Sequence, residues 1–378
     1  MKIDRITVHV FRAPTPRPVA TSFGVMRDRP AVFVRLSDGE GAHGWGEIFA
    51  NWPAAGAEHR ARLLMEDMAD LVLGREVVTP DQLFDALTQQ THIRALQCGE
   101  WGPFRQVIAG LDAAMHDLFA RRAGMSLAAY LSSDASPSVP VYASGLQVSA
   151  AEEGIAAAQA RGITAFKVKV GFDARRDLVD LRALMEGLQE GERLMADANQ
   201  AWSLREALDF ARAAEGLRLA WLEEPIRADS PADAWRRLAQ SCTIPLAAGE
   251  NIVGFQDFAE AIESKSFAVL QPDVAKWGGV SGCFRVARQT VSAGLRYCPH
   301  FLGGGIGLLA SAHLLAAAGG DGMLELDAND NPLRDSFVAQ HPVREGAFPI
   351  AEQPGLGIDT LPDAIAPFAT LTLDSAGG

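Results

Sequence analysis

The sequence has little cysteine, no block of basic residues and no long apolar run. Its four cysteines are scattered without a C-x-x-C pair, which predicts reduced thiols in the core rather than a disulfide framework. The 34 Lys and Arg against 47 Asp and Glu give a net charge of −13, which argues against nucleic acid or an anionic membrane as a partner. Apolar segments are broken by Gly, Ser or His before about 18 residues, so no membrane span is predicted. Because no apolar signal region follows Met1, we expect a cytoplasmic protein.

What the sequence does contain suits a large globular enzyme. Hydrophobic residues fill 48% of its 378 positions and charged residues 21%, and this length predicts two or three domains. Residues 1–131 pass from alternating apolar and polar side chains, typical of an antiparallel sheet, to helical periodicity, and therefore predict an α+β domain. A Ser-, Pro- and Asp-rich stretch at 132–140 marks the start of a second domain over 132–336. A Pro- and Gly-rich segment follows at 337–378.

The second domain repeats a short apolar run followed by a helical segment. Helical periodicity occurs at residues 173–188, 204–215, 229–241, 254–263 and 279–293. Parallel strands need such crossovers, because a tight hairpin cannot join them. The repeat therefore predicts an α/β fold in which parallel strands and helices close into a barrel.

Three apolar runs of this domain end in a carboxylate, at Asp197, Glu223 and Glu250. The first two acids are 26 residues apart and the last two 27. Such a spacing fits one strand, one helix and two loops, which places the acids side by side at C-terminal strand ends. Clustered carboxylates repel one another unless a cation lies among them. Oxygen ligands without Cys or His suit Mg²⁺.

The same register continues on both sides of these acids. Lys169 ends the preceding run, and Asp273, His300 and Glu325 end the three runs that follow. Lys167 lies two residues before Lys169, so both ammonium groups point to one side of a strand and into one cavity. Active sites of parallel barrels lie at the C-terminal strand ends, so all of these residues are candidate catalytic groups.

These motifs together resemble the enolase superfamily, specifically its mandelate racemase subgroup. The resemblance covers essentially the whole chain and rests on Lys167-x-Lys169, Asp197-x-Asn199, Glu223-Glu224-Pro225, Gly249-Glu250, the Asp273/His300 pair and Glu325. It implies a modified (β/α)7β TIM barrel with an N-terminal α+β capping domain that the C-terminal segment completes. It also implies that Asp197, Glu223 and Glu250 bind one Mg²⁺, with Glu224 supporting them rather than binding the metal.

The resemblance further implies a small-molecule carboxylate substrate whose oxygens bind the metal. Removing the adjacent α-proton moves negative charge onto those oxygens, so binding is strongest in the transition state. Lys169 is expected to be one base, with a pKa lowered by Lys167 and Mg²⁺. His300, oriented by Asp273, is expected to be the base or acid on the opposite face.

Two further residues complete the implied site. Glu325 is expected to hydrogen-bond the substrate carboxylate and support the enediolate, and Asn199 to make a polar contact beside Asp197. A Lys on one face and a His–Asp pair on the other suit racemisation or epimerisation. The same arrangement suits β-elimination, as in acid-sugar dehydratases, and lactone cycloisomerisation. Spacing does not separate these reactions.

Substrate specificity is expected from two loops of the first domain. One is predicted at 14–30, between the first two strands, and the other at 92–105. Their basic side chains favour a sugar acid or sugar-acid lactone, and the 23–29 stretch loosely resembles galactarolactone cycloisomerases. Phe23, Met26 and Trp101 would also suit an aryl or apolar substrate, so that alternative stays open. The candidate substrate-binding residues are Arg27, Arg29, His92, Arg94 and Trp101.

Other classes of function make different demands on the sequence. A zinc hydrolase barrel would carry His-x-His at the end of its first strand, where Tyr142-Ala143-Ser144 stands, which excludes the usual form. A non-catalytic family member normally loses a metal ligand or a base, and none is missing here. Metal content and turnover on an acid-sugar library would decide between enzyme and non-catalytic protein. An acidic enzyme of this kind is also expected to self-associate, as a dimer to octamer.

Overall fold

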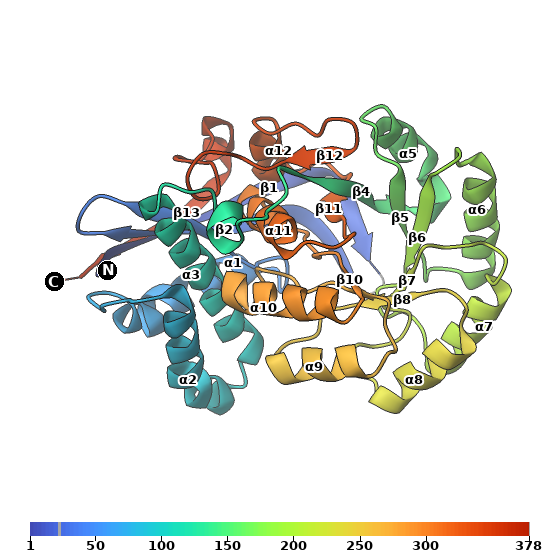
Figure 1. The fold of residues 1–378 in the computed structure, drawn as a ribbon, viewed down its shortest axis with the longest axis horizontal. Coiled ribbons are helices and arrows are strands. Elements are labelled where there is room, and N and C mark those ends of the chain that lie inside the picture. The colour runs from blue at the N-terminus through green and yellow to red at the C-terminus, as the bar shows by residue number, and fades with distance from the viewer. Residues whose placement is uncertain (22–23, 378) are drawn as a thin grey trace.

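The alternating N-terminal residues build an antiparallel sheet in the order β13-β1-β2-β3. The computed structural model describes residues 1–21 and 24–377. The sheet consists of β1 (Ile3–Thr21), β2 (Gly24–Asp38), β3 (His43–Ile48) and, from the C-terminal segment, β13 (Ala369–Ala376). Because β13 pairs with β1, with Ala376 opposite Arg5, the two chain ends lie together beside this sheet (Figure 1).

The loop predicted at 14–30 is wrong, because most of this stretch is a β-hairpin. The ladder between β1 and β2 is interrupted after Pro14 and resumes where Val19 pairs with Met26. Proline has no backbone N–H to donate to the neighbouring strand, which explains why the ladder is interrupted here. The strand β1 nevertheless continues past the prolines. Phe23 lies outside the described residues.

Four helices follow this sheet: α1 (Gly56–Leu63), α2 (Pro80–Cys98), α3 (Trp101–Arg122) and α4 (Leu127–Leu131). Helices α1 and α3 contact its strands, and α2 and α4 pack against α3. The loop predicted at 92–105 is also wrong. Only Gly99 and Glu100 separate α2 from α3, because Gly99 adopts a left-handed φ of 73° and ends the helix abruptly. Helix α3 lies close against β3, where a Cβ at Gly46 would lie 2.0 Å from the Gly110 carbonyl oxygen.

The parallel strands of the second part form a barrel, as predicted. Their order is β10-β9-β8-β7-β6-β5-β4-β11, with β12 antiparallel on β4, among the residues that the structure describes. The strands are β4 (Ser138–Gln147), β5 (Ala165–Lys169), β6 (Arg193–Asp197), β7 (Leu222–Glu223), β8 (Leu246–Ala248), β9 (Val269–Leu270), β10 (Arg296–Tyr297), β11 (Leu324–Asp327) and β12 (Ala347–Pro349).

Helices follow the strands around the outside of the barrel (Figure 1). They are α5 (Glu152–Gln159), α6 (Ala174–Gly187), α7 (Leu204–Ala213), α8 (Ala232–Ser241), α9 (Phe255–Glu263), α10 (Gly279–Ser292), α11 (Gly305–Ala318) and α12 (Pro332–Val338). The helices predicted from periodicity correspond to α6 through α10. Short 3₁₀ or π turns occur at Leu64–Met68, Ala69–Leu71, Val148–Ala150 and Asp363–Phe368.

The two ends of the strand order meet between β10 and β11. No ladder joins them within the described ranges, but the amide of Met323 donates to Sγ of Cys298 at 3.3 Å. A Cβ at Gly322 would lie 1.8 Å from the Tyr297 carbonyl oxygen, so only glycine allows this approach. Inside the barrel, one buried cluster takes a side chain from each strand or its edge: Tyr142, Ala165, Met195, Trp221, Ala247, Val269, Cys298 and Met323. The barrel is thus filled below its mouth.

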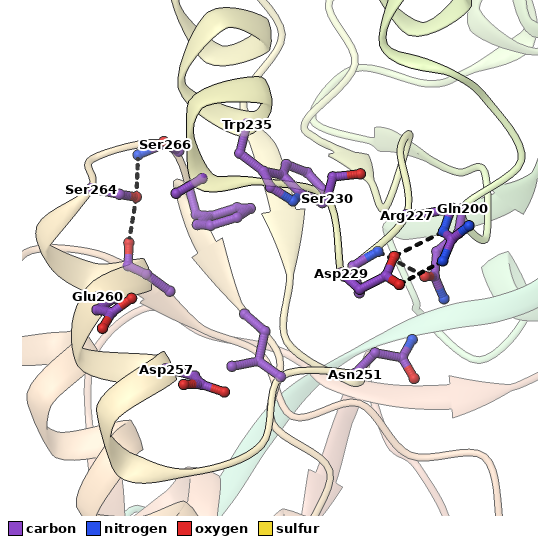
Figure 2. A pocket seen from close by; sticks show the side chains of 15 residues that line it. Gln200, Arg227, Asp229, Ser230, Trp235, Asn251, Asp257, Glu260, Ser264 and Ser266 are labelled. Atoms are coloured by element: carbon purple, nitrogen blue, oxygen red, sulfur yellow. Dashed lines mark hydrogen bonds and ion pairs between the residues drawn. The ribbon is translucent and has the colours of Figure 1, made fainter.

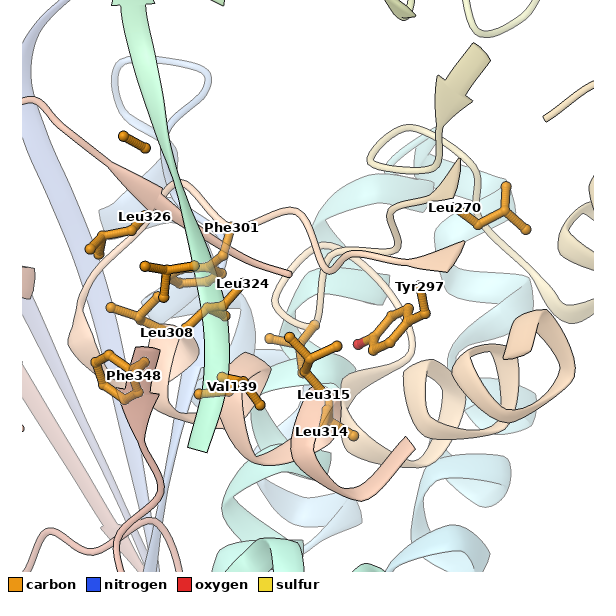
Figure 3. Close-up of a cluster of buried hydrophobic side chains, with 14 of the residues drawn as sticks. Val139, Leu270, Tyr297, Phe301, Leu308, Leu314, Leu315, Leu324, Leu326 and Phe348 are labelled. Carbon is orange, nitrogen blue, oxygen red and sulfur yellow. The ribbon is translucent and has the colours of Figure 1, made fainter. Parts of the chain in front are cut away.

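Helix α11 joins the two parts of the molecule. All of its residues are buried, which fits a helix that is apolar on every side. Leu308, Leu314 and Leu315 pack near Leu324 and Val139 of the barrel strands (Figure 3). Its N-terminal end meets β3 of the first part through Gly304 and Gly307. A change in the position of the first domain on the barrel would therefore change the contacts of α11.

The four cysteines are free, as predicted, but only Cys283 and Cys298 are core thiols, because Cys98 is exposed and Cys242 partly buried. Among the helices of residues 1–21 and 24–377, none has the length and apolar character needed to cross a membrane.

Candidate active site

The strand register brings the predicted acids and lysines to one end of the barrel. Lys169 pairs with Asp197 across β5 and β6, and Asp197 pairs with Glu223 across β6 and β7. Glu250 lies two residues beyond β8, which pairs with β7. All three acids are buried or nearly so, because they lie at the C-terminal mouth under the first domain.

Lys167 lies among the carboxylates at the base of the site. Its Nζ is 2.7 Å from Glu223, 2.8 Å from Glu325 and 3.8 Å from Asp197, and its side chain is 1% exposed. Burial alone would lower the pKa of Lys167, but Glu223 and Glu325 outweigh burial and raise it well above the usual range. Lys167 is therefore a fixed positive charge.

Lys169 reaches the mouth of the barrel, where its Nζ donates to Asp197 at 2.6 Å. Burial would lower the pKa of Lys169, but the Asp197 carboxylate outweighs burial and raises it. Lys167 does lower the pKa of Lys169, as predicted, but the ion pair with Asp197 is the stronger effect, so the net shift in this structure is upward. Asn199 lies where the sequence predicted, and its amide donates to Asp197 at 2.8 Å.

His300 lies on the far side of the mouth, following β10, with its ring between two carboxylates. Nδ1 is 2.8 Å from Asp273 and Nε2 is 2.5 Å from Glu250. Burial would lower the pKa of His300, but Glu250, Glu325 and Asp273 together raise it well above the usual range. Strands β6 to β9 separate β5 from β10 in the sheet order, so Lys169 and His300 face each other across the acids.

The donor set suits a hard divalent cation. Asp197, Glu223 and Glu250 offer carboxylate oxygens on three consecutive strands, and burial raises the pKa of Glu223 to about 7 despite the nearby lysines. In this conformation Lys167, Lys169 and His300 contact the oxygens of these acids. Within the described residues, no three Asp, Glu, His or Cys side chains are arranged to hold a metal ion. The residues fit Mg²⁺ in the chemistry of their donors, three carboxylates at the ends of consecutive strands.

A second polar chain lies beside Glu250. The Asn251 amide donates to Glu250 at 2.8 Å and to both oxygens of Glu224 at 3.0 Å. Lys276 Nζ donates to the Asn251 oxygen at 2.7 Å and lies 5.2 Å from the Phe49 ring centre. Glu224 is fully buried and held by Asn251, which fits a supporting role.

The candidate bases open into a cavity of about 480 Å³ between the barrel mouth and the first domain. Lys169, Asn199, Glu250 and His300 line its barrel side. Its other lining residues are Met26, Phe49, Asn51, Trp52, Pro53, Gln200, Asn251, Lys276 and Leu302. The wall that the first domain provides is therefore largely apolar.

The structure does not bring the five predicted substrate-binding residues of the first domain to this cavity. Arg27 is exposed, and Arg29 is buried in an ion pair with Asp327 at 2.6 Å. His92 and Arg94 lie on exposed turns of α2, and Trp101 begins α3 against His92. A pattern of basic residues did not reveal that α2 continues through them.

Sequence reasoning named Met26, which does line the cavity, but missed the other residues that form the wall. Lys276 lies three positions after Asp273 in the same strand-end segment, a signal that could have identified it. Asn51 and Trp52 lie three and four positions after the end of β3, where the alternating pattern ends. No feature of their own sequence indicated that they cover the barrel mouth.

A second depression of about 620 Å³ lies at the barrel rim between α8 and α9 (Figure 2). It shares Gln200 and Asn251 with the catalytic cavity, and an ion pair of Arg227 with Asp229 lies at its edge. Because it contains neither candidate base nor any of the three strand-end acids, it is not the reaction site.

Comparison with known proteins agrees with this geometry. Residues 5–131 match the mandelate racemase/muconate lactonizing enzyme N-terminal domain, and residues 150–364 match the enolase C-terminal domain-like family. The chain belongs to the mandelate racemase/muconate lactonizing enzyme family. The resemblance to the enolase superfamily and the predicted barrel with its capping domain are thereby confirmed. The chain is an enolase-superfamily enzyme of the lyase or isomerase type.

Several family members align along nearly the whole chain. A mandelate racemase/muconate lactonizing enzyme from Bordetella bronchiseptica RB50 is 48% identical, with a TM-score of 0.90 over 95% of this chain and 97% of that one. The D-galactarolactone cycloisomerase of Agrobacterium fabrum is 27% identical over 97% of this chain and 99% of its own. A racemase from Streptomyces coelicolor A3(2), solved with bound magnesium, is 26% identical, with a TM-score of 0.85 over 97% of this chain and 100% of that one. Other relatives are named as sugar-acid dehydratases and racemases.

Proposed function

We propose that this enzyme uses Mg²⁺ to remove a proton α to a carboxylate, with Asp197, Glu223 and Glu250 as the metal ligands. The observation that carries the proposal is the placement of Lys169 and His300 on opposite sides of these acids, both lining one cavity. When bound, the metal supplies positive charge to the substrate carboxylate as the enediolate forms. The magnesium-bound racemase of the same family supports this choice of metal.

The chain's own residues have separate tasks in this proposal. Lys169 removes or returns the proton on one face, and His300 acts on the other with its Nδ1–H held by Asp273. Lys167 keeps a fixed positive charge under the substrate carboxylate, because Glu223 and Glu325 hold it in place. Glu325 itself is fixed by the Ser144 hydroxyl and the Phe301 amide, so it is ready to contact the same carboxylate.

We propose a sugar acid or sugar-acid lactone as the substrate, converted by dehydration or cycloisomerisation. The D-galactarolactone cycloisomerase and the sugar-acid dehydratases among the relatives support this class. Lys276, Asn51 and Gln200 can hydrogen-bond hydroxyl groups, while Phe49 and Trp52 provide a flat apolar wall suited to a ring face. The wall favours a cyclic substrate over an extended polyhydroxylated chain.

Racemisation is the second candidate reaction. The placement of two bases on opposite sides of the cavity favours it, because 1,1-proton transfer needs one base on each face. A substrate screen separates the candidates. Sugar acids and their lactones are incubated with enzyme and Mg²⁺ in D₂O and followed by ¹H NMR, with the Glu223→Gln variant, which should lose both metal and turnover, as the blank.

The expected result is loss of water or lactone rearrangement for at least one compound, with the α-carbon becoming a keto carbon and solvent deuterium entering at the β-carbon. Epimerisation without elimination would assign the racemase reaction instead. Absence of both α-exchange and elimination over the whole library would contradict proton abstraction. We also propose that the chain forms a closed homo-oligomer, and a monomer by light scattering at working concentration would contradict that.

A further inference from the structure

The four residues that follow His300 are held by side chains of other elements. The Phe301 amide donates to Glu325 at 3.2 Å, and the Leu302 carbonyl accepts from Asn51 at 2.5 Å. The Gly303 carbonyl accepts from Asn331 at 2.9 Å, and the Gly304 amide donates to Glu47 at 2.5 Å. The backbone conformation of this segment, residues 301–304, is therefore fixed by side chains from elsewhere in the chain.

Two of these four contacts come from the first domain. Asn51 follows β3, and Glu47 lies within β3, 257 positions from Gly304 along the chain. The other two come from the barrel side. The segment thus lies at the junction of the two parts of the molecule.

Glu47 makes two contacts at the start of α11. Its side chain is buried, and its two oxygens accept from the amides of Gly304 at 2.5 Å and Gly307 at 2.8 Å. The N-cap residue of α11 is Gly304, which has no side chain that could cap the helix. An acid from another part of the chain thus occupies the place of a helix cap, where the helix end favours negative charge.

The glycines of this stretch leave room for the carboxylate. A Cβ at Gly303 would lie 2.7 Å from Glu47 Oε1, and one at Gly304 would lie 3.0 Å from the same atom. Burial raises the pKa of Glu47 to about 7, although the two amides lower it. A carboxylate is therefore costly here, and an apolar contact would hold the two parts together without that cost.

The contacts continue from Glu47 to the catalytic cavity. Leu302, held by Asn51, lines the cavity, and so do Asn51 itself and His300. The ring of His300 is held on the other side by Asp273, at 2.8 Å from Nδ1. Fixing the backbone just after His300 therefore fixes the direction from which its ring enters the cavity.

We propose that Glu47 is a positioning residue for His300: by holding the amides of Gly304 and Gly307, it ties the segment that carries the base to the first domain. The base is then aligned only while the first domain is seated on the barrel. Glu47 touches neither metal nor substrate. The inference rests on the proposed function for its catalytic consequence, but its structural part does not depend on the substrate.

The test measures alignment of His300 directly, by labelling with diethyl pyrocarbonate and peptide mass spectrometry. In the full-length protein, Glu47→Gln is expected to raise the labelling rate of His300 several-fold. The exposed His92 should be labelled at an unchanged rate, and so should His116 and His313, which are buried elsewhere. Glu76→Gln, an exposed acid of the first domain, is the matched control and should leave all four rates unchanged.

General loosening of the fold would raise the labelling of His116 and His313 together with that of His300. That result, or an unchanged rate at His300, would overturn the proposal. If Glu47→Gln does not fold, Glu47→Asp decides by the same measurement, because it keeps the charge and shortens the side chain that reaches the amides of Gly304 and Gly307. An unchanged rate at His300 in folded Glu47→Asp would then count against the proposal.

A kinetic readout adds the catalytic part, with D-galactarolactone as the probe. Glu47→Gln should lower kcat about tenfold or more while KM changes less than about threefold, because the residue acts on the base and not on substrate binding. A rise in KM alone would overturn the positioning role. If wild-type enzyme shows neither α-exchange nor elimination with any sugar acid or lactone, the proposed function fails, whereas selective labelling of His300 would still support the structural link.

Discussion

The Nδ1 atom of His300 lies 2.8 Å from Oδ2 of Asp273, although the two residues are 27 positions apart in the sequence. The pairing of β9 with β10 brings them together. The other oxygen of Asp273 accepts from the amides of Ala275 and Lys276, so the carboxylate cannot turn away. The Nε2 atom of His300 is therefore the one directed toward the acids and the cavity.

Asp273→Asn should lower kcat by about 100-fold or more, because general acid–base catalysis by a positioned His contributes on this scale. KM should change little, because Asp273 does not line the cavity. Steady-state kinetics on the substrate found in the screen provide the measurement. Asp209→Asn, an exposed acid on α7, is the matched control. Activity of the Asp273 variant within twofold of wild type would contradict the pairing's role.

Glu223→Gln should lose both bound Mg²⁺ and turnover. The purified wild-type protein should bind about one Mg²⁺ per chain, because three acids on consecutive strands offer one site. Chelation should abolish activity without unfolding the barrel, which circular dichroism can follow. Glu263→Gln, an exposed acid on α9, should bind metal normally. Stoichiometric zinc held by Cys298 or His300 would contradict this account.

Arg29→Met should destabilise the protein by about 3–5 kcal/mol, because it leaves the buried Asp327 without its closest partner. Arg334, whose Nη1 is 3.3 Å from the same carboxylate, should keep the loss near the lower end. Urea unfolding measures the effect, and Arg27→Met, at an exposed site, should change stability by less than about 0.5 kcal/mol. An increased KM for Arg29→Met without loss of stability would restore the substrate-binding role predicted from the sequence.

Stability should fall as pH rises from about 4 to 8, in part because of Asp112 on α3. Both of its oxygens accept from Ser281, on α10, yet burial raises its pKa from an ordinary 3.8 to about 8. Between these pH values the folded protein keeps a proton that the unfolded chain has lost, so unfolding becomes easier by up to about 1.4 kcal/mol per pH unit. Above pH 8 this group contributes no further change.

Asp112→Asn should flatten this pH dependence, because the amide needs no proton to remain neutral. The melting temperature of the variant relative to wild type should therefore be higher at pH 8 than at pH 5. Asp70→Asn, an exposed acid, should leave the difference between the two pH values as in wild type. A variant that loses more stability at pH 8 than at pH 5 would show that Asp112 is ionised in the fold.

The barrel and its catalytic residues could be predicted because the barrel repeats. One strand, one helix and two loops recur at nearly constant spacing, so each strand end is located by its distance from the last. Asp197, Glu223 and His300 were found in this way, and the register of the strands places them at one mouth. Local sequence period and global fold agree here, which is why the pattern was sufficient.

The cavity wall could not be predicted, because it depends on contacts between distant parts of the chain. Arg29 pairs with Asp327, 298 positions away, and Glu47 with Gly304, 257 positions away. No local pattern records such a partner. The loops predicted at 14–30 and 92–105 failed for a related reason: proline and glycine interrupted the strand or helix so briefly that the element continued or a new one began at once.

The most direct test of the account follows deuterium at the α-carbon in single-base variants. If Lys169 and His300 act on opposite faces, His300→Asn should stop overall turnover while Lys169 still exchanges the proton on its own side. Lys169→Ala should lose exchange on that side and keep exchange by His300 only for a substrate of the opposite configuration. ¹H NMR in D₂O with Mg²⁺ measures both. Full turnover in either single variant would mean that the chemistry does not depend on these two residues.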